Sequence, residues 1–371
     1  MDNKLLYQIA ITQIKGLGSI NSKNLLAYVG DIEEIFHQKS HILQKIPGIG
    51  ILLSKSILEQ KDAALEKATK EIQFITKHGI TPLFYTDKNY PERLKECPDA
   101  PILLYYKGNT NLNTQKTLAI VGTRNATEYG KTMCTQLIKE LANNHPELCI
   151  ISGLAYGIDI CAHKEALHMH LPTVAVLGHG LDRIYPAQHA TIAKKILTSG
   201  GLLTEFPSET NADKPNFVRR NRIIAGTTDA TLIVESAARG GAIITTEIAN
   251  SYNRDVFAVP GKCTDEWSVG CNNLIKQHKA ALVNSASDIE YIMGWTKEQT
   301  SQKIEQQQSL FIDLSDTEQE IFTIIKQNKV VHIDVLAIKI SKSIKDLSPI
   351  LLSMEFKGVI KCLPGNIYSV V

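Results

Sequence analysis

The chain has 371 residues, of which 43% are hydrophobic and 21% charged, and its 40 Lys and Arg residues nearly balance 38 Asp and Glu residues, for a formal net charge of +2. This composition excludes collagen-like and disordered classes, and at about 100–200 residues per domain the length predicts two or three domains. The longest apolar runs are far shorter than the ~18 residues that a membrane span needs. The first residues also lack the features of a secretory signal, so we expect a cytoplasmic protein.

Residues 1–80 contain short apolar-periodic segments between glycine-rich turns, which predicts a small helical domain. Two of these turns have glycines at alternate positions, Gly16-Leu17-Gly18 and Gly48-Ile49-Gly50. The pattern is typical of tandem helix-hairpin-helix motifs in a SAM-like domain, whose backbone N–H groups can approach a phosphate. Helical hairpins whose glycines serve only close packing remain an equally weighted alternative.

Residues 81–296 change character, because short apolar runs now alternate with helical segments. Continuous apolar strands separated by helices are typical of a parallel sheet that helices cover on both faces. We therefore predict an α/β domain with a Rossmann-like, doubly wound sheet. Its predicted strands are 82–85, 102–106, 118–121, 149–152, 174–177, 202–205, 232–234, 256–259 and 282–283.

Residues 297–314 are rich in glutamine and lack an apolar period, which predicts a linker. After the linker, Ser315 to Glu318 form a capping box at the start of a helix. The further predicted elements are helices through 324, at 334–340 and at 344–356, and a β-hairpin of 359–363 and 367–371. Residues 315–371 therefore indicate a winged helix, a fold that binds DNA in some proteins and protein in others.

Glycine-rich loops follow several predicted strands, at the sheet edge where ligands bind in open α/β folds. Such glycines let backbone amides converge on an anion, and the dipole of the next helix favours negative charge. We therefore predict a phosphate-binding surface. Its predicted members are Gly122, Thr123, Ser152, Gly153, Gly178, Gly180, Gly240 and Gly241. A dinucleotide site is not expected, because Arg183 stands where the G-x-G-x-x-G fingerprint needs its last glycine.

The densest basic segment is Phe217-Val218-Arg219-Arg220-Asn221-Arg222, which Lys214 precedes. Cations beside an aromatic ring suit single-stranded nucleic acid, because the cations bind the backbone and the ring stacks on a base. The alternative is that some of these arginines pair with buried acids such as Asp159, Asp182 or Glu235. We expect Arg219 and Arg220 to face solvent, and Asn221 and Arg222 to be the better structural candidates.

Seven scattered cysteines never follow C-x-x-C spacing, so we interpret them as reduced core residues. His168 and His170 form an H-x-H pair without a second ligand pair at zinc spacing. We expect no metal, no cofactor and no catalytic residues of these kinds.

Several strings in the central domain make the chain resemble the DprA/Smf family of DNA-processing proteins. The helical domain before the Rossmann-like region and the winged helix after it also resemble that family. The matching strings are Tyr90 to Leu94, Val121 to Arg124, Ser152 to Asp159, Gly178 to Asp182 with Tyr185-Pro186, Arg220 to Gly226, Asp255 to Gly261, and Gly270 to Ile275.

The resemblance implies a protein without catalysis that binds single-stranded DNA and helps to load the RecA recombinase onto it during natural transformation. It implies that Arg124, Lys214 and Arg220 hold phosphates and that Phe217 contacts a base. It also implies a homodimer. The residues expected at the dimer interface are Asn272, Leu274, Ile275 and Leu282.

The main alternative is an enzyme of the same fold superfamily, a nucleoside-monophosphate phosphoribohydrolase with the signature P-G-G-x-G-T-x-x-E. Here Gly240-Gly241 and Glu247 keep that spacing, but Ile243-Ile244 replace the G-T pair. Two β-branched residues remove the close approach to a 5′-phosphate, which disfavours the enzyme.

No domain is basic overall: residues 1–108 have 14 basic and 12 acidic residues, residues 109–296 have 17 of each, and residues 297–371 have 9 of each. A role in nucleic-acid binding therefore depends on a few local cations at the strand ends and not on bulk charge.

Overall fold

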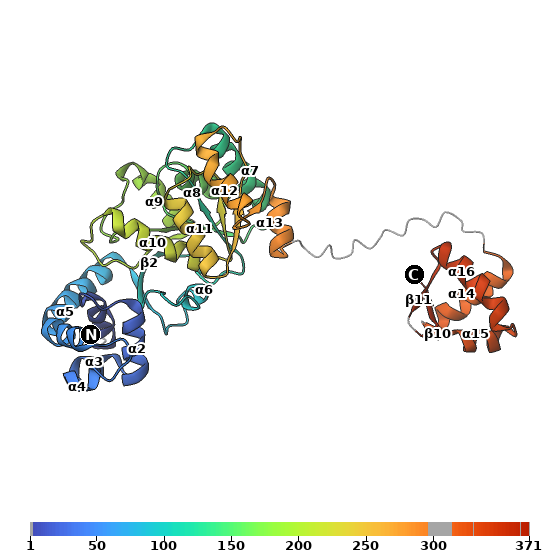
Figure 1. Cartoon of the computed structure of the whole chain (residues 1–371), viewed down its shortest axis with the longest axis horizontal. Coiled ribbons are helices and arrows are strands. Elements are labelled where there is room, and N and C mark those ends of the chain that lie inside the picture. Colours follow the sequence, from blue (N-terminus) through green and yellow to red (C-terminus); the bar gives the residue numbers. More distant parts are fainter. Residues whose placement is uncertain (1–2, 296–313, 329, 364, 371) are drawn as a thin grey trace. The chain divides into compact units, whose positions relative to one another are not determined.

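A computed structural model describes residues 3–295, 314–328, 330–363 and 365–370. The chain divides into two compact units, Met1–Thr296 and Lys297–Val371 (Figure 1). Among the described residues, no helix is both long and apolar enough to cross a membrane.

The N-terminal region is helical, as predicted, and its two glycine turns pack against each other. Gly16 and Gly48 both have φ +85°, which favours glycine, and a Cβ atom on Gly48 would lie 2.4 Å from Oδ1 of Asn21. At Gly48, glycine is therefore needed because the second turn packs closely against Asn21 of the first hairpin. The helices are α1 (Asn3–Ala10), η1 (Ile11–Gln13), α2 (Ser19–Val29), α3 (Ile32–His37), α4 (Ser40–Leu43) and α5 (Ile51–His78).

The first hairpin lies against the α/β region, whereas the second one exposes apolar side chains at the start of α5. A hollow of about 90 Å³ is lined by Ser19 and Ser22 of α2 together with Glu205 from the α/β region. Behind it, the backbone N–H of Ser208 donates to the carboxylate of Glu71 on α5, with an N–Oε1 distance of 3.0 Å. In the second hairpin, by contrast, Leu52 is 86% exposed.

The α/β region contains a nine-stranded sheet with the order β1-β2-β6-β5-β4-β3-β7-β8-β9. Neighbours from β6 to β9 are parallel, whereas β2 pairs antiparallel with both β1 and β6. The strands are β1 (Thr81–Phe84), β2 (Leu103–Gly108), β3 (Thr117–Val121), β4 (Cys149–Ser152), β5 (Thr173–Val176), β6 (Gly201–Thr204), β7 (Ala230–Ile233), β8 (Asp255–Ala258) and β9 (Ala281–Leu282). The predicted Rossmann-like fold is confirmed.

Helices cover both faces of this sheet because successive strand residues point to opposite sides. In β3, Leu118 and Ile120 belong to the hydrophobic core that α7 and α8 cover, whereas Ala119 and Val121 belong to the core that α10 covers. The helices are α6 (Glu92–Lys95), α7 (Glu128–Asn144), α8 (Ile158–His168), η2 (Ala187–His189), α9 (Ala190–Ser199), α10 (Lys214–Gly226), α11 (Gly241–Ser251), η3 (Glu266–Ser268), α12 (Val269–Lys276) and α13 (Ala286–Met293).

The strand order reverses between β3 and β7. From β3 the chain adds β4, β5 and β6 on one side and then returns to place β7 on the other side. Loops that leave the carboxyl ends of β3 and β7 therefore diverge, and in open α/β sheets ligands bind in the crevice at this point. The topology fixes where a site should lie before any side chain is considered.

The C-terminal unit is a winged helix with its own hydrophobic core, as predicted. The capping box is present, since Ser315 N donates to the Glu318 carboxylate at 2.8 Å. The prediction omitted one strand, β10, which pairs with β12. The elements are α14 (Asp316–Asn328), β10 (Val330–His332), α15 (Ile333–Ile340), α16 (Ile344–Phe356), β11 (Ile360–Leu363) and β12 (Ile367–Val370).

Candidate nucleic-acid interface

A crevice of about 870 Å³ lies at the switch point between β3 and β7. It is lined by the loops after β3, β4 and β7, by α10 and the start of α11, and by Tyr185 and Trp267. The lining includes these residues predicted for the site: Gly122, Thr123, Arg124, Lys214, Phe217, Arg220, Asn221, Gly240 and Gly241.

The arginines separate into paired and unpaired ones. Of the eight arginines in the chain, five form ion pairs with carboxylates: Arg93, Arg183, Arg219, Arg222 and Arg254. Arg220 binds backbone carbonyls. Within the described residues, only Arg124 and Arg239 lack both kinds of partner, and both line the crevice. Two guanidinium groups without an ion pair therefore line the same hollow, which the carboxylates of Asp159 and Glu247 also line.

Phe217 lies among aromatic and cationic neighbours in the crevice. The Cζ atom of Arg124 lies 5.8 Å from the centre of its ring, and that of Arg220 lies 5.9 Å away. The ring of Tyr185 is tilted by 39° to it, with the centroids 5.6 Å apart. An aromatic face with cations around it is the combination that binds a base and its phosphates.

The prediction that Arg220 faces solvent is wrong. Arg220 is 4% exposed, and its Nη1 donates to the carbonyl oxygens of Gly153, at 2.8 Å, and of Val176. Burial lowers the pKa of Arg220 to about 10, while the nearby Asp159 carboxylate opposes that change. The group stays charged at neutral pH and ties the ends of β4 and β5 to α10.

Arg219 and Arg222 also have structural partners, but not those expected. Both donate to Oε2 of Glu205, at 2.6 and 2.5 Å, a buried carboxylate that the sequence reasoning did not consider. Of the acids considered, Asp159 lies near Arg220 as that alternative expected, whereas Asp182 pairs with Arg183 and Glu235 accepts from the backbone and hydroxyl of Thr127. Arg219 faces solvent as predicted, with 56% of its side chain exposed, whereas Arg222 is buried, and neither lines the crevice.

The predicted glycines fall into two groups when a Cβ atom is placed on each. On Gly153 it would lie 2.5 Å from the Arg220 guanidinium, and on Gly178 it would lie 2.8 Å from the Phe217 ring. On Gly122 and Gly180 it would also come within 2.5 Å of protein atoms. These four glycines serve internal packing. On Gly240 and Gly241 the nearest atoms would be 3.7 and 4.0 Å away, so only these two present open backbone to the crevice.

Ser152 does not belong to the site. It is fully buried and its hydroxyl donates to the carbonyl of Ile120 at 2.6 Å. Thr123 lines the crevice, and its hydroxyl accepts from the backbone N–H of Asn125 at 3.1 Å. Its hydroxyl therefore shapes the loop after β3.

Arg239, Tyr185 and Trp267 line the crevice but were absent from the predicted site. Arg239 directly precedes Gly240 in a loop that was predicted to bind phosphate, and Tyr185 belongs to a string that matches the family. Trp267 carried no signal, because its position follows from the hydrogen bond between its carbonyl oxygen and the backbone N–H of Ser236, at 2.7 Å, which is a long-range contact.

The expected dimer residues are also divided. Leu274 is 4% exposed because it packs in the core of its own sheet, so it cannot contact a partner. Asn272 bonds both backbone groups of Gly261, at 3.2 and 3.0 Å. Leu282 is 48% exposed and Ile275 is half-buried, so these two remain available.

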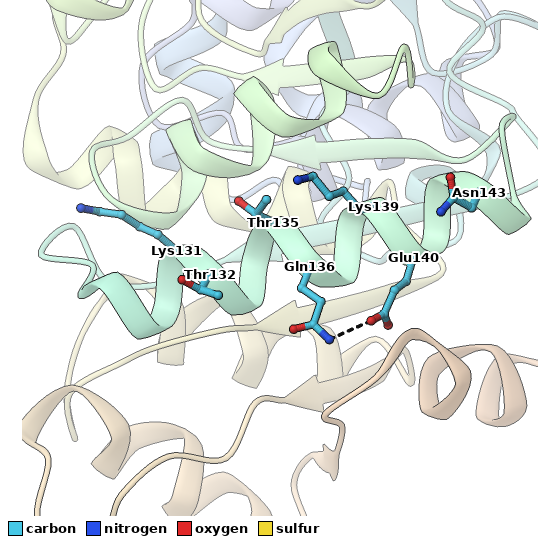
Figure 2. A pocket seen from close by; sticks show the side chains of 7 residues that line it. All are labelled: Lys131, Thr132, Thr135, Gln136, Lys139, Glu140 and Asn143. Carbon is cyan, nitrogen blue, oxygen red and sulfur yellow. Dashed lines mark hydrogen bonds between the residues drawn. The ribbon is translucent and has the colours of Figure 1, made fainter.

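Another hollow, of about 490 Å³, runs along α7 (Figure 2). Its charges are already compensated: Lys131 pairs with Glu128 at 2.7 Å, Lys139 lies 4.0 Å from Glu165, and Gln136 donates to Glu140 at 2.8 Å. This hollow therefore offers an anion less than the crevice does.

The winged helix presents few groups that read DNA. The exposed face of α16 carries Lys345, Ser348, Leu352 and Phe356, the last 84% exposed. Arg, Asn and Gln are absent from α16, which leaves Lys345 and Ser348 as the polar side chains of this face that could read a base edge. Among the described residues, no group of three His, Cys, Asp or Glu side chains could hold a metal ion.

The fold and the crevice define a doubly wound α/β protein with arginines that lack ion pairs at its switch point, joined to a winged helix. Residues 81–293 match the family model for DNA recombination-mediator protein A, and residues 307–366 match the DprA winged helix domain. The chain belongs to this DprA/Smf family, which confirms the resemblance.

Bacterial Smf and DprA proteins are similar in sequence to much of this chain. It is 35% identical to Protein Smf of Synechocystis over 72% of this chain and 68% of that protein. It is 31% identical to Protein Smf of Escherichia coli over 84% and 86% of the two chains. DNA processing protein DprA of Streptococcus pneumoniae is 41% identical over 55% of this chain and 71% of that protein.

Two solved structures are similar as well. DprA from Streptococcus pneumoniae superposes with a TM-score of 0.67 at 34% identity, over 77% of this chain and 97% of that one. DprA from Helicobacter pylori superposes with a TM-score of 0.52 at 28% identity, over 58% of this chain and 96% of that one. That structure describes how the Helicobacter pylori protein binds single-stranded DNA.

Proposed function

We propose that this protein binds single-stranded DNA in the crevice and helps to load the RecA recombinase onto it, in DNA uptake and recombination. The observation that carries the proposal is the distribution of arginines: the two without carboxylate or carbonyl partners, among the described residues, both line the crevice. A chain that compensates its other arginines internally has left these two for an external anion. The single-stranded DNA bound by the relative from Helicobacter pylori supports the same reading.

The crevice suits a single strand better than a duplex. Phe217 offers a ring for stacking on an unpaired base, and Lys214 and Arg124 lie beside the same hollow to hold phosphates. Stacking on a base needs that base to be unpaired and accessible. We therefore expect higher affinity for single strands than for duplexes of the same length.

The same geometry gives little support to the alternative enzyme. Ile243 and Ile244 lie within the first turn of α11, where they line the crevice with apolar side chains. Glu247 also lines the crevice, so the enzyme remains testable. We propose a protein without catalysis, and an assay for base release from nucleoside monophosphates tests this part directly.

The test of strand binding is fluorescence anisotropy with a labelled oligonucleotide and the full-length protein. Lys214→Ala combined with Arg124→Ala should weaken binding and reduce the log–log salt slope by ~1.4, since each phosphate contact on single strands contributes ~0.7. Arg183→Gln is the matched control, because Arg183 is exposed and pairs with Asp182 outside the crevice. An unchanged slope in the double variant would overturn the proposed site.

Homodimerisation and RecA loading complete the proposal. Support for the dimer is the exposed Leu282 on the edge strand β9. Leu282→Glu should shift the protein to monomer in sedimentation equilibrium without unfolding it. Loading is tested by whether the protein accelerates RecA assembly on strands coated with single-strand-binding protein; no acceleration would remove this function and leave strand binding intact.

A further inference from the structure

The crevice contains a further aromatic residue and a second unpaired arginine, Trp267 and Arg239. The proposed contacts do not use Trp267, and they give Arg239 no particular position along the strand. Arg239 lies in the loop after β7, and Trp267 lies in η3 after β8. Phe217, by contrast, lies on α10 and packs with Tyr185 from the loop after β5. The two aromatic residues therefore come from different ends of the crevice lining.

Trp267 is held firmly in place by backbone contacts. Ser236 N donates to the carbonyl of Trp267 at 2.7 Å, and Gly270 N donates to the carbonyl of Ser236 at 2.8 Å. The backbone N–H of Trp267 donates to Asp265 at 3.1 Å. Its side chain is half-buried and lines the crevice. Because the backbone of Trp267 is fixed before binding, a ligand that stacks on its ring orders little of the chain.

The spacing of the strands separates Trp267 from Phe217. Phe217 lies near Arg124, which follows β3, whereas Trp267 follows β8, and β7 lies between these two strands. Neighbouring strands lie about 4.8 Å apart, so the ends of β3 and β8 are about 10 Å apart. Cavities of about 300 Å³ already hold small ligands, so the crevice of about 870 Å³ has room for more than one nucleotide.

We propose that Trp267 and Arg239 form a second nucleotide subsite in the crevice. The indole stacks on a base, the guanidinium holds an adjacent phosphate, and the strand follows the carboxyl edge of the sheet from Phe217 towards Trp267. The subsite takes any base, because stacking on a ring does not depend on sequence. This inference rests on the proposed binding of single strands and specifies how far along the crevice the strand extends.

The protein carries its own reporter for this subsite. Its only two tryptophans are Trp267 and Trp295, and Trp295 is 9% exposed and packs against His145 with ring centroids 6.0 Å apart. Full-length protein is titrated with oligothymidylate while tryptophan emission and the anisotropy of a labelled strand are both followed. Binding should quench the emission. Trp267→Phe should abolish the quenching while affinity stays within about threefold, since Phe retains a stacking face. Trp295→Phe, the matched control, should keep the quenching.

Substitution by alanine distinguishes the contribution of Trp267 to binding from that of Arg239. Trp267→Ala should weaken binding about 5- to 150-fold with an unchanged salt slope. Arg239→Ala should reduce the slope by ~0.7, and Arg239→Lys should restore it. The inference is overturned if the strand binds by anisotropy while emission does not change and Trp267→Phe and Trp267→Ala bind like the unmodified protein. If the unmodified protein shows no anisotropy change at all, the proposed function fails instead.

Discussion

Neighbouring basic residues on α10 have different roles, although the sequence presents them as one cluster. Lys214 is exposed and lines the crevice, whereas Arg220 is 4% exposed and joins two strand ends. Arg219 and Arg222 share the carboxylate of Glu205. Successive helix residues point about 100° apart, so a run of basic residues must spread around the helix, and only the packing of α10 decides which of them is buried.

We predict that Arg220→Ala lowers both stability and strand affinity, whereas Lys214→Ala lowers affinity alone. Removing the guanidinium leaves the buried carbonyls of Gly153 and Val176 without their donor, at a cost of about 2–3 kcal/mol. Lys214 is exposed, so its truncation should change stability by no more than about 0.5 kcal/mol. Urea unfolding, with anisotropy on the same samples, measures both quantities. Equal stability of the two variants would contradict the structural role of Arg220.

A side chain at Gly240 should leave the folded protein stable but should interfere with the bound strand. Its φ of 168° is extended backbone that any residue adopts, and a Cβ atom would lie 3.7 Å from the nearest protein atom. We therefore predict that Gly240→Ala folds with unchanged thermal stability but binds strands at least about fivefold more weakly, because the methyl group fills space that a phosphate needs. Gly178→Ala is the contrast, since its methyl group displaces the ring of Phe217 and should lower the melting temperature. Unchanged affinity in Gly240→Ala would show that no phosphate approaches this loop.

Helices and strands could be predicted where the sequence pattern within the element itself defines it. The apolar runs at nine positions became the nine strands, because parallel strands buried on both faces need continuous apolar sequence. Strand β10 was missed because Val330 to His332 is too short for a period and is defined by its pairing with β12. Trp267 was missed for the same reason, because its place in the crevice depends on contacts with a loop far away in the sequence.

The capping box of α14 gives the winged helix a predictable response to acid. The carboxylate of Glu318 accepts from Ser315 and from the Lys357 ammonium, at 2.8 and 2.7 Å, and the ammonium and these hydrogen bonds lower the pKa of Glu318 from 4.5 to about 2. Because the folded pKa is lowered, the stabilisation is complete above about pH 4.5 and is lost as the pH falls towards 2.

We therefore expect Glu318→Gln to destabilise the winged helix by about 1–2 kcal/mol at neutral pH. The difference from the unmodified protein should shrink as the pH falls from 4.5 towards 2, because the unfolded chain then binds a proton at Glu318 while the folded protein does not. Calorimetry of the full chain at several pH values measures it. A difference that stays constant down to pH 3 would assign the effect to packing and not to charge.

At the scale of the whole molecule, the position of the site follows from topology and its strength from a few charges. The reversal of strand order between β3 and β7 places the crevice, and the alternation of strands and helices in the sequence already implies such a reversal. The sequence could not show which cations stay unpaired, because that depends on carboxylates such as Glu205 that reach them only in the folded sheet.

Because only a few charges in the crevice determine the strength of binding, we predict that the affinity for single strands depends weakly on salt concentration. The chain has a net charge of +2 and no basic domain, so long-range attraction contributes little. Three cations line the crevice with no acidic partner among the described residues, Arg124, Lys214 and Arg239. At ~0.7 for each phosphate contact, the log–log slope should have a magnitude of ~2 for each crevice. Anisotropy titrations across a range of salt concentrations measure it. A slope of ~5 or more would mean that the strand follows a basic surface elsewhere on the protein, and the crevice would then be a minor part of the interface.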